Sequence, residues 1–397
     1  MVKIAVIGFG NIGTGLVELV SRNKDIITRD CGTEVEIKYI VDIRDFKGHP
    51  LEHKIVSDFS IVVNDPEVSV VAEMIGGSHP AFEFSMAALK AGKNVVTSNK
   101  EVVANFGDVL MQTATENGVA YLFEGAVGGA IPIIRPMRTS LSSDNILAIN
   151  GILNGTTNYI LTSMFTQGAS FDDALADARR LGYAEANPAA DVDGVDACRK
   201  ICILSALAYG KSFKCEDIHT EGIRAISKRD VADASKLGAS VKLIGHTAMH
   251  DDGRIAVMVS PRVIVGTNPL CHVDDVFNGI LVSAQSDGDL MFYGRGAGQI
   301  PTAGAVLADI VEIVKHLDGR QTSTKPWVVS DSSEMIPVSE NSFVYYCRVK
   351  GDKVPDGAKL LSFDDGESAF TLDTIKEADC DKLLAGYEVS SRIRFLK

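Results

Sequence analysis

The sequence predicts an α/β protein in which a parallel-sheet domain precedes a domain with a mixed sheet. A short apolar strand from Lys3 to Ile7 runs into a glycine turn and a helix from Thr14 to Val20. Strands then alternate with helices as far as about Met137, which is the order that builds a parallel sheet. Beyond this point the order of elements is mixed and includes two strands, predicted from Ala239 to Met249 and from Ile255 to Val265. This order suggests a sheet with helices on one face.

The composition of the 397 residues fits an ordinary globular protein, with 46% hydrophobic and 23% charged residues. The net charge of −13 argues against nucleic-acid binding, which needs a basic surface. The seven cysteines form no CxxC pair, so we expect reduced thiols in a cytoplasmic protein. The chain enters a strand at once and no apolar run approaches the roughly 20 residues of a membrane span. We therefore expect no targeting segment and no membrane span.

The first turn carries a dinucleotide-binding fingerprint in the run Gly8-Phe9-Gly10-Asn11-Ile12-Gly13. Gly8 permits the tight turn, Gly10 lets the backbone approach a pyrophosphate, and Gly13 lets helix and strand pack closely. The helix N-terminus offers N–H groups and a positive dipole end to the phosphates. We therefore predict an N-terminal Rossmann domain that binds a dinucleotide.

The second strand, predicted from Val35 to Asp42, leads to the residues that could choose the cofactor. Asp42 fits the acid that holds the ribose hydroxyls, and a polar insertion from Arg22 to Thr33 explains its larger distance from Gly8. Arg44 could hold a 2′-phosphate, or it could be a surface arginine. Because Asp42 favours NAD and Arg44 favours NADP, the choice of cofactor stays open.

Two later strands end in residues that could reach a cofactor, since ligands bind at the carboxyl ends of parallel strands. The strand from Val68 to Ile75 runs into Gly76, where a cofactor would pass close to the backbone. The strand from Asn94 to Thr97 is followed by Ser98 and Lys100. Lys100 is a candidate catalytic or cofactor-contacting cation, or simply a solvated residue in the first turn of the next helix.

A glycine-rich turn from Glu124 to Pro132 follows the strand predicted from Val119 to Phe123. It presents several backbone carbonyls beside one carboxylate, an oxygen-rich set that could hold a hard cation. The alternative is a tight hinge at a domain boundary. A second glycine turn, Gly294 to Gly298, feeds a long apolar helix from Ala303 to His316 and could meet the cofactor or the substrate.

A polar turn from Asn154 to Asn158, which includes Gly155 and Thr156, caps a helix in the second domain. Its hydroxyls and amides would suit a small zwitterionic substrate. N-capping of the helix would explain the same residues equally well.

A strongly charged stretch between Gly182 and Lys200 leads into a further helix. Gly182 can close the preceding helix, and Glu185 and Asp191 lie in the loop that follows. Asp196 and Lys200 are four residues apart on the helix and therefore share one face. Such a pair could be a solvated ion pair. Because this helix continues into an apolar run typical of a buried helix, we favour a lysine that transfers a proton to a carbonyl oxygen.

The motifs GFGNIG, SNKE, FEGAVGGAIPII, GILNGTTNYIL, GYAEANPAADVDGVDACRK and GRGAGQIPTAGAV occur together and in order. Over roughly residues 1 to 320 the chain thereby resembles homoserine dehydrogenases. The resemblance implies reversible reduction of L-aspartate 4-semialdehyde to L-homoserine with NADPH or NADH, on the route to threonine, methionine and isoleucine. A homodimer or a dimer of dimers is expected. The C-terminal segment does not clearly match the regulatory module that many relatives carry, so threonine regulation stays open.

The resemblance also implies roles for the candidate residues. Lys200 would donate a proton to the aldehyde oxygen, Asp196 would orient that lysine, and Lys100 would sit between nicotinamide and substrate. With the interpretations above, the substrate set is Glu185, Asp191, Thr156 and Gly155. The cofactor set is Gly8 to Gly13, Asp42, Arg44, Gly76, Ser98, Lys100, Gly296 and Ala297. A sodium or similar monovalent cation would be held by Glu124, Val127, Gly129 and Ile131.

We expect a dinucleotide-binding domain over 1–136, a substrate-binding and dimerisation domain over 137–300, a helix returning to the first domain over 301–320, and a small C-terminal α/β segment over 321–397. That last segment could be a sensing or packing module, or extra strands on an oligomer surface. Two other functions stay open: another NAD(P)-dependent dehydrogenase of a small amino or hydroxy acid, and a dinucleotide-binding sensor without turnover.

Overall fold

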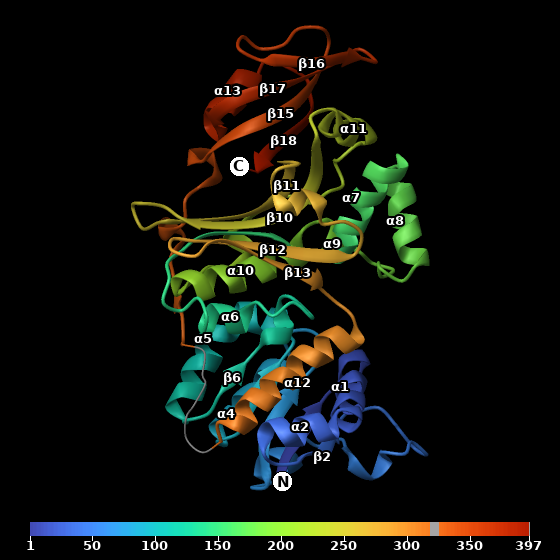
Figure 1. Ribbon diagram of the computed structural model, residues 1–397, viewed down its shortest axis with the longest axis vertical. Helices are drawn as coiled ribbons and strands as arrows, with labels where there is room; N and C mark the ends of the chain where they lie inside the picture. Colours follow the sequence, from blue (N-terminus) through green and yellow to red (C-terminus); the bar gives the residue numbers. More distant parts are fainter. Residues whose placement is uncertain (318–324, 397) are drawn as a thin grey trace. The chain divides into compact units, whose positions relative to one another are not determined.

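The computed structural model describes residues 1–317 and 325–396 (Figure 1). The chain forms two compact units. Unit 1 comprises Met1–Ser143, Ala206–Lys214 and Arg295–Val329, and unit 2 comprises Asp144–Ser205, Cys215–Gly294 and Ser330–Lys397. The predicted domain boundary between 320 and 321 lies outside the described residues. Within the described ranges, every helix is too short or too polar to span a bilayer.

Unit 1 is built on a parallel sheet with the strand order β3-β2-β1-β4-β5-β6. Its central strands are short and mainly apolar, as expected of strands that are covered on both faces. The predicted N-terminal Rossmann-like sheet is thereby confirmed. The strand bounds are β1 Val2–Ile7, β2 Val35–Val41, β3 Ile55–Val56, β4 Val68–Glu73, β5 Asn94–Thr97 and β6 Tyr121–Leu122.

Helix α12 (Gln299–Lys315) packs against α1 and α2 in unit 1 (Figure 1). Its Gln299 side chain donates a hydrogen bond to the hydroxyl of Thr14 at 3.0 Å. Residues 24–31, which the sequence analysis treats as part of a polar insertion, form α2 and bury Ile27. The other helix bounds are α1 Asn11–Arg22, α2 Lys24–Cys31, α3 Ser60–Asn64, α4 Ala81–Lys90, α5 Lys100–Glu116 and α6 Ile134–Arg138. Unit 1 also contains a short parallel pair of strands, β8 Lys211–Ser212 and β14 Val328–Val329.

Unit 2 is built on a mixed sheet with the order β13-β12-β7-β10-β11-β18-β15-β17-β16, to which β9 is added at β11. The long antiparallel pair β10 (Ala239–Met249) and β11 (Ile255–Val265) has the predicted bounds. The strands β12 and β13 are not evident in the sequence, because Gly279 and Gly288 interrupt the apolar pattern. The remaining bounds are β7 Ile146–Ile152, β9 His219–Thr220, β12 Phe277–Ala284, β13 Gly288–Arg295, β15 Ser342–Lys350, β16 Lys359–Asp364, β17 Glu367–Lys376 and β18 Val389–Leu396.

Helices pack on this sheet and carry several candidate residues. Helix α7 packs against β10 and β12. Gly245 of β10 lets α10 approach, because a Cβ there would lie 3.1 Å from Ile201. The bounds are α7 Gly155–Gln167, α8 Phe171–Arg180, α9 Ala189–Val192, α10 Val195–Tyr209, α11 Lys228–Lys236 and α13 Glu377–Leu384.

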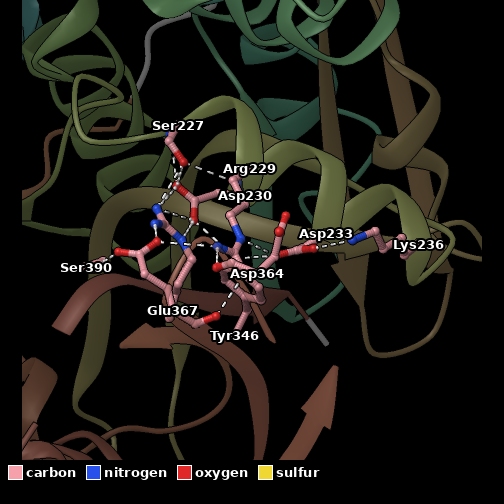
Figure 2. Close-up of polar contacts among 10 residues, drawn as sticks. Ser227, Arg229, Asp230, Asp233, Lys236, Tyr346, Asp364, Glu367 and Ser390 are labelled. Carbon is pink, nitrogen blue, oxygen red and sulfur yellow. Dashed lines mark hydrogen bonds and ion pairs between the residues drawn. The ribbon is translucent and has the colours of Figure 1, made fainter. Parts of the chain in front are cut away.

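The C-terminal strands are fastened to α11 by buried charges that we call the C-terminal network (Figure 2). Arg348 of β15 donates from Nε to Asp230 at 3.2 Å and from a terminal nitrogen to the Ser227 hydroxyl at 3.0 Å, and it also pairs with Glu367. The Tyr346 hydroxyl donates to Asp233 at 3.0 Å. Because β18 also pairs in parallel with β11, the C-terminal segment continues the sheet of unit 2. The network comprises Ser227, Arg229, Asp230, Asp233, Tyr346, Arg348 and Glu367.

Candidate active site

The glycine turn after β1 has the close packing that its sequence predicts. Gly8 has a φ of +94°, and a Cβ there would lie 3.0 Å from the carbonyl oxygen of Met74. A Cβ on Gly13 would lie only 2.0 Å from the carbonyl oxygen of Gly8. Gly10 is the N-cap of α1 and has no side chain to bond the first N–H groups. The turn therefore leaves the positive end of α1 able to receive a phosphate.

Asp42 and Arg44 bond to each other and to the glycine turn. Oδ1 of Asp42 accepts from the Arg44 backbone N–H at 3.0 Å and from Arg44 Nε at 2.9 Å. Oδ2 accepts from the Phe9 N–H at 2.8 Å and from Arg44 Nη2 at 2.8 Å. These four bonds use the full accepting capacity of a carboxylate. Hydrogen bonding from Arg44 holds the pKa of Asp42 well below its ordinary value, whereas the Arg44 side chain remains 57% exposed.

The ends of β4 and β5 are joined by a residue that the sequence analysis passed over. Asn99, the N-cap of α5, donates to the carbonyls of Ile75 and Gly77 at 2.8 and 2.7 Å, and its side-chain oxygen accepts from the first turn of α5. The two bonds to the carbonyls hold the residues on either side of Gly76 and so fix the turn that contains it. Lys100 is the first residue of α5, and Ser98 lies against Gly125, whose Cβ would meet that of Ser98 at 3.0 Å.

Glu73, at the end of β4, is a second buried polar residue that the sequence analysis missed. Its carboxyl accepts from the Thr97 hydroxyl at 2.7 Å and from the Ile75 N–H at 2.5 Å. Burial raises the pKa of Glu73 to about 7. Both Glu73 and Asn99 are polar residues next to the carboxyl end of an apolar strand, and this position is the signal that could have identified them.

The carboxylate of Glu124 is already bonded to backbone N–H groups. Oε1 accepts from the N–H groups of Ile133 and Ile134 at 2.7 and 2.9 Å, and Oε2 accepts from that of Arg135 at 2.7 Å. Glu124 therefore fastens the start of α6. A cation in this loop would be held mainly by carbonyl oxygens, which the hard-cation chemistry allows.

The rest of that loop packs against the second glycine turn, within unit 1. Gly129 has a φ of +56°, and a Cβ there would lie 2.6 Å from Gly296 and 3.0 Å from the Ala297 nitrogen. The Ala130 N–H donates to the carbonyl of Arg295 at 3.0 Å. Val127 and Ile131 are buried on the same loop. The predicted cation residues and the predicted cofactor residues Gly296 and Ala297 are thus neighbours.

Asp196 and Lys200 form a buried pair on α10, with 3% and 6% of each residue exposed. Lys200 Nζ donates to Asp196 Oδ2 at 2.8 Å and to the carbonyl oxygen of Leu153 at 2.8 Å. A buried ammonium is costly unless it is paired and hydrogen-bonded. These two contacts therefore stabilise the charged amine and fix its position.

Asn154 connects this pair to Asp191, although sequence reasoning placed Asn154 only in a capping turn. The prediction that Asp191 lies in a loop is wrong, because Ala189–Val192 form the short helix α9. Asn154 Nδ2 donates to Asp191 Oδ1 at 2.7 Å and to Asp196 Oδ2 at 2.9 Å. Its side-chain oxygen accepts from the Thr157 N–H at 2.9 Å as the N-cap of α7. Three predicted residues, Asp191, Asp196 and Lys200, thus lie in one hydrogen-bonded group centred on Asn154.

The other predicted substrate residues lie at the start of α7 and in the loop after α8. Gly182 closes α8 with a φ of +78°. The Thr156 hydroxyl donates to the carbonyl of Tyr183 at 2.6 Å, and this bond connects the loop after α8 to α7. Gly155 is the first residue of α7, where a Cβ would lie 2.7 Å from the carbonyl oxygen of Val276. Glu185 is exposed on its loop.

Comparison with known proteins covers most of the chain. Residues 8–124 match the family model described as homoserine dehydrogenase, NAD binding domain, and residues 132–311 match the model described as homoserine dehydrogenase. A homoserine dehydrogenase from Synechocystis sp. is 40% identical over 352 residues, which are 88% of this chain and 79% of that protein.

Solved structures give the same result. The crystal structure of a homoserine dehydrogenase from Thiobacillus denitrificans matches with a TM-score of 0.91 at 32% identity, covering 100% of this chain and 98% of that one. A hyperthermophilic archaeal homoserine dehydrogenase in complex with NADPH matches with a TM-score of 0.68 at 28% identity, covering 82% and 99%. The fold class predicted from the sequence is confirmed. The chain therefore belongs to the homoserine dehydrogenase family and carries that family's NAD-binding domain.

Proposed function

We propose that the chain catalyses the reversible reduction of L-aspartate 4-semialdehyde to L-homoserine with NADPH or NADH. The observation that carries this proposal is the buried Lys200 amine, which is held by Asp196 and the Leu153 carbonyl at 2.8 Å each. Membership of the homoserine dehydrogenase family supports the choice of substrate.

The catalytic group is Lys200. A bound nicotinamide would supply the hydride to the aldehyde carbon. As negative charge develops on the aldehyde oxygen, Lys200 donates a proton from Nζ, and in the reverse direction it takes that proton back. Asp196 keeps the amine in place, and Asn154 keeps the Asp196 carboxylate in place. Acid–base assistance of this kind is worth roughly 10²–10⁴-fold in rate.

The substrate's own charges suit the residues around this amine. The carboxylates of Glu185 and Asp191 bind the amino group of the substrate. Gly155 and Thr156 stand at the N-terminus of α7, where backbone N–H groups favour a carboxylate. Lys100, at the start of α5, assists as a cation beside the nicotinamide.

The dinucleotide lies along Gly8 to Gly13, Gly76, Ser98 and the Gly296-Ala297 turn, and we assign the preference to NADP. The support is that all four accepting positions of Asp42 are used by Arg44 and the Phe9 N–H. Asp42 then has little capacity for ribose hydroxyls. Arg44 uses Nε and Nη2 on Asp42 and the Phe9 carbonyl. Its exposed guanidinium would pair with a 2′-phosphate through Nη1.

A sodium or similar monovalent cation is assigned to the loop of Glu124, Val127, Gly129 and Ile131, with the carbonyl oxygens as its ligands. The Glu124 carboxylate supports the loop through its three backbone hydrogen bonds. Turnover that does not change when sodium replaces a bulky organic cation in the buffer would remove this assignment.

We assign dinucleotide binding to residues 1–136 and substrate binding with dimerisation to 137–300. Residues 301–320 return to the first domain, and 321–397 form an appended segment. The protein acts as a homodimer or a dimer of dimers in the cytoplasm, without nucleic-acid or membrane partners. Light scattering on the purified protein measures the oligomer, and a monomer at working concentration contradicts this assignment.

The test is oxidation of L-homoserine with NADP and with NAD, followed by the absorbance of the reduced cofactor. We expect turnover with homoserine and, in reverse, a clear preference for aspartate 4-semialdehyde over other small aldehydes. A faster reaction with another amino or hydroxy acid would favour a different dehydrogenase. Dinucleotide binding without any turnover would favour a sensor.

A further inference from the structure

Three cysteine thiols converge on one point in unit 2, outside the residues assigned to the reaction. Cys198 and Cys202 lie on α10, and Cys215 begins a short 3-10 turn, Cys215–Asp217. The three Sγ atoms all lie within 4.8 Å of one another. The Sγ atoms of Cys202 and Cys215 are 3.3 Å apart, and the Cys198 thiol donates to the carbonyl of Cys215 at 3.6 Å.

The sequence accounts for this convergence. Cys198 and Cys202 are four residues apart on α10, so their side chains share one helix face. They are 3% and 5% exposed, whereas Cys215 is partly exposed and gives the group an entrance. All seven cysteines lie in the described part of the chain, and all carry thiols rather than disulfides.

The geometry fits a metal ion better than a disulfide. A disulfide joins two sulfurs, and it leaves the position of the third unexplained. Sulfurs bound to one ion at about 2.3 Å each are at most about 4.6 Å apart. The three Sγ atoms all lie within 4.8 Å of one another, and those of Cys202 and Cys215 are 3.3 Å apart, so the group is already close to this limit.

The ligand set selects the class of ion. Thiolates select soft ions, such as Cu(I) and zinc. Structural zinc takes four ligands, but in residues 1–317 and 325–396 no carboxylate or imidazole joins the three thiols. Arg199 acts electrostatically on both Cys198 and Cys215. Its positive charge offsets part of the negative charge that three thiolates and a monovalent ion would carry.

We propose that Cys198, Cys202 and Cys215 form a three-thiolate site for a soft monovalent metal ion of the Cu(I) type. Each sulfur that coordinates the ion releases its thiol proton to solvent. The site does not use the residues of the proposed reaction, so its test does not depend on that reaction.

The experiment titrates the reduced, metal-free protein with Cu(I) under anaerobic conditions against a coloured Cu(I) chelator. We expect one ion per chain, with three sulfur neighbours in X-ray absorption. Cys215→Ser should weaken binding by more than the roughly 10–100-fold that loss of an outer partner costs. Cys31→Ser, which changes a partly exposed cysteine of unit 1, should bind as the wild type does.

A second measurement needs no variant and guards against misfolding of Cys215→Ser. Alkylation of the wild-type protein, mapped by mass spectrometry, should be slowed by one equivalent of Cu(I) at Cys215 and unchanged at Cys31. Absence of stoichiometric binding overturns the proposal. So does equal weakening in both variants, or a Cys202–Cys215 disulfide that forms while the ion stays in solution.

Discussion

Unit 2 buries two groups of charged side chains, and the two are built differently. At the candidate active site, the Lys200 amine bonds the Asp196 carboxylate and the Leu153 carbonyl, and Asn154 positions that carboxylate. In the C-terminal network, Arg348 bonds Asp230, Glu367 and the Ser227 hydroxyl. Ser227 and Asp230 also form a capping box at the start of α11.

The difference separates a chemical role from a structural one. The charges of the C-terminal network have partners on α11 and on the C-terminal strands, so the network fixes β15 against α11 (Figure 2). Hydrogen bonds in such a network also strengthen one another. The Lys200 amine is held through contacts that run from the N-cap of α7, Asn154, to Asp196 and on to the amine. We expect the first group to control stability and the second to control turnover.

The largest expected effect tests the catalytic side of this comparison. Lys200→Ala removes the proton donor, so turnover of homoserine should fall about 10²–10⁴-fold. NADP affinity should stay near the wild-type value, because the glycine turn belongs to unit 1. Steady-state kinetics and calorimetric titration with NADP measure the two effects. Turnover close to normal would reject Lys200 as the donor.

The next effect tests the structural side. Arg348→Ala leaves Asp230 without the Arg348 cation and leaves Glu367 with the more distant Arg229, at 3.6 Å. Removal of one buried partner costs about 3–5 kcal/mol in the free energy of unfolding. Turnover per folded molecule should be nearly unchanged. Arg254→Ala is the matched control, because Arg254 makes exposed ion pairs with Asp252 and Glu340 that are worth about 1 kcal/mol or less. Equal losses in both variants, measured by urea unfolding, would contradict the structural role of the network.

Glu73 is a buried carboxyl in unit 1 that is bonded to a hydroxyl and an N–H group, and its effect on stability should depend on pH. Its pKa of about 7 lies above the ordinary value, so the folded state holds its proton more tightly. The stability that this contributes is complete below about pH 4.5 and is lost as the pH rises through 7. Glu73→Gln cannot titrate. As the pH rises from 5 to 8, the wild type should therefore lose about 1–3 kcal/mol of its free energy of unfolding relative to Glu73→Gln. A constant difference across this range would place the pKa of Glu73 at its ordinary value.

The smallest effect concerns an exposed arginine. Arg44→Ala should raise the KM for NADP about tenfold, equivalent to roughly 1.4 kcal/mol, and should change the KM for NAD much less. Lys47→Ala is the control, since it changes another exposed cation close by in sequence. An equal rise for both cofactors would mean that Arg44 acts through Asp42 and the glycine turn rather than through a 2′-phosphate.

Sequence reasoning was strongest where a short pattern dictates local geometry. The glycines of the first turn, the strands of β10 and β11, and the four-residue spacing of Asp196 and Lys200 all follow from local rules. Contacts between distant segments could not be read in this way. Asn154 lies 42 residues from Asp196, and two partners of Arg348, Ser227 and Asp230, lie more than a hundred residues earlier.

The side-chain partners of Glu124 and Asp42 were unpredictable for the same reason. A lone glutamate after a strand gives no sign that three N–H groups nine to eleven residues later will surround it. Likewise, Asp42 and Arg44 were read as competitors for the cofactor, whereas they bond each other. A hydrogen-bond partner depends on the packed fold, and the residue type alone does not specify it.

The central claim is that Lys200 acts in the hydride-transfer step itself. The most direct test is the primary deuterium isotope effect on turnover, measured with C4-deuterated NADPH in the wild type and in Lys200→Ala. We predict slower turnover in the variant with an isotope effect at least as large as in the wild type, because the chemical step alone is slowed. A slower variant with a smaller isotope effect would contradict this account, since the loss would then lie in binding or release.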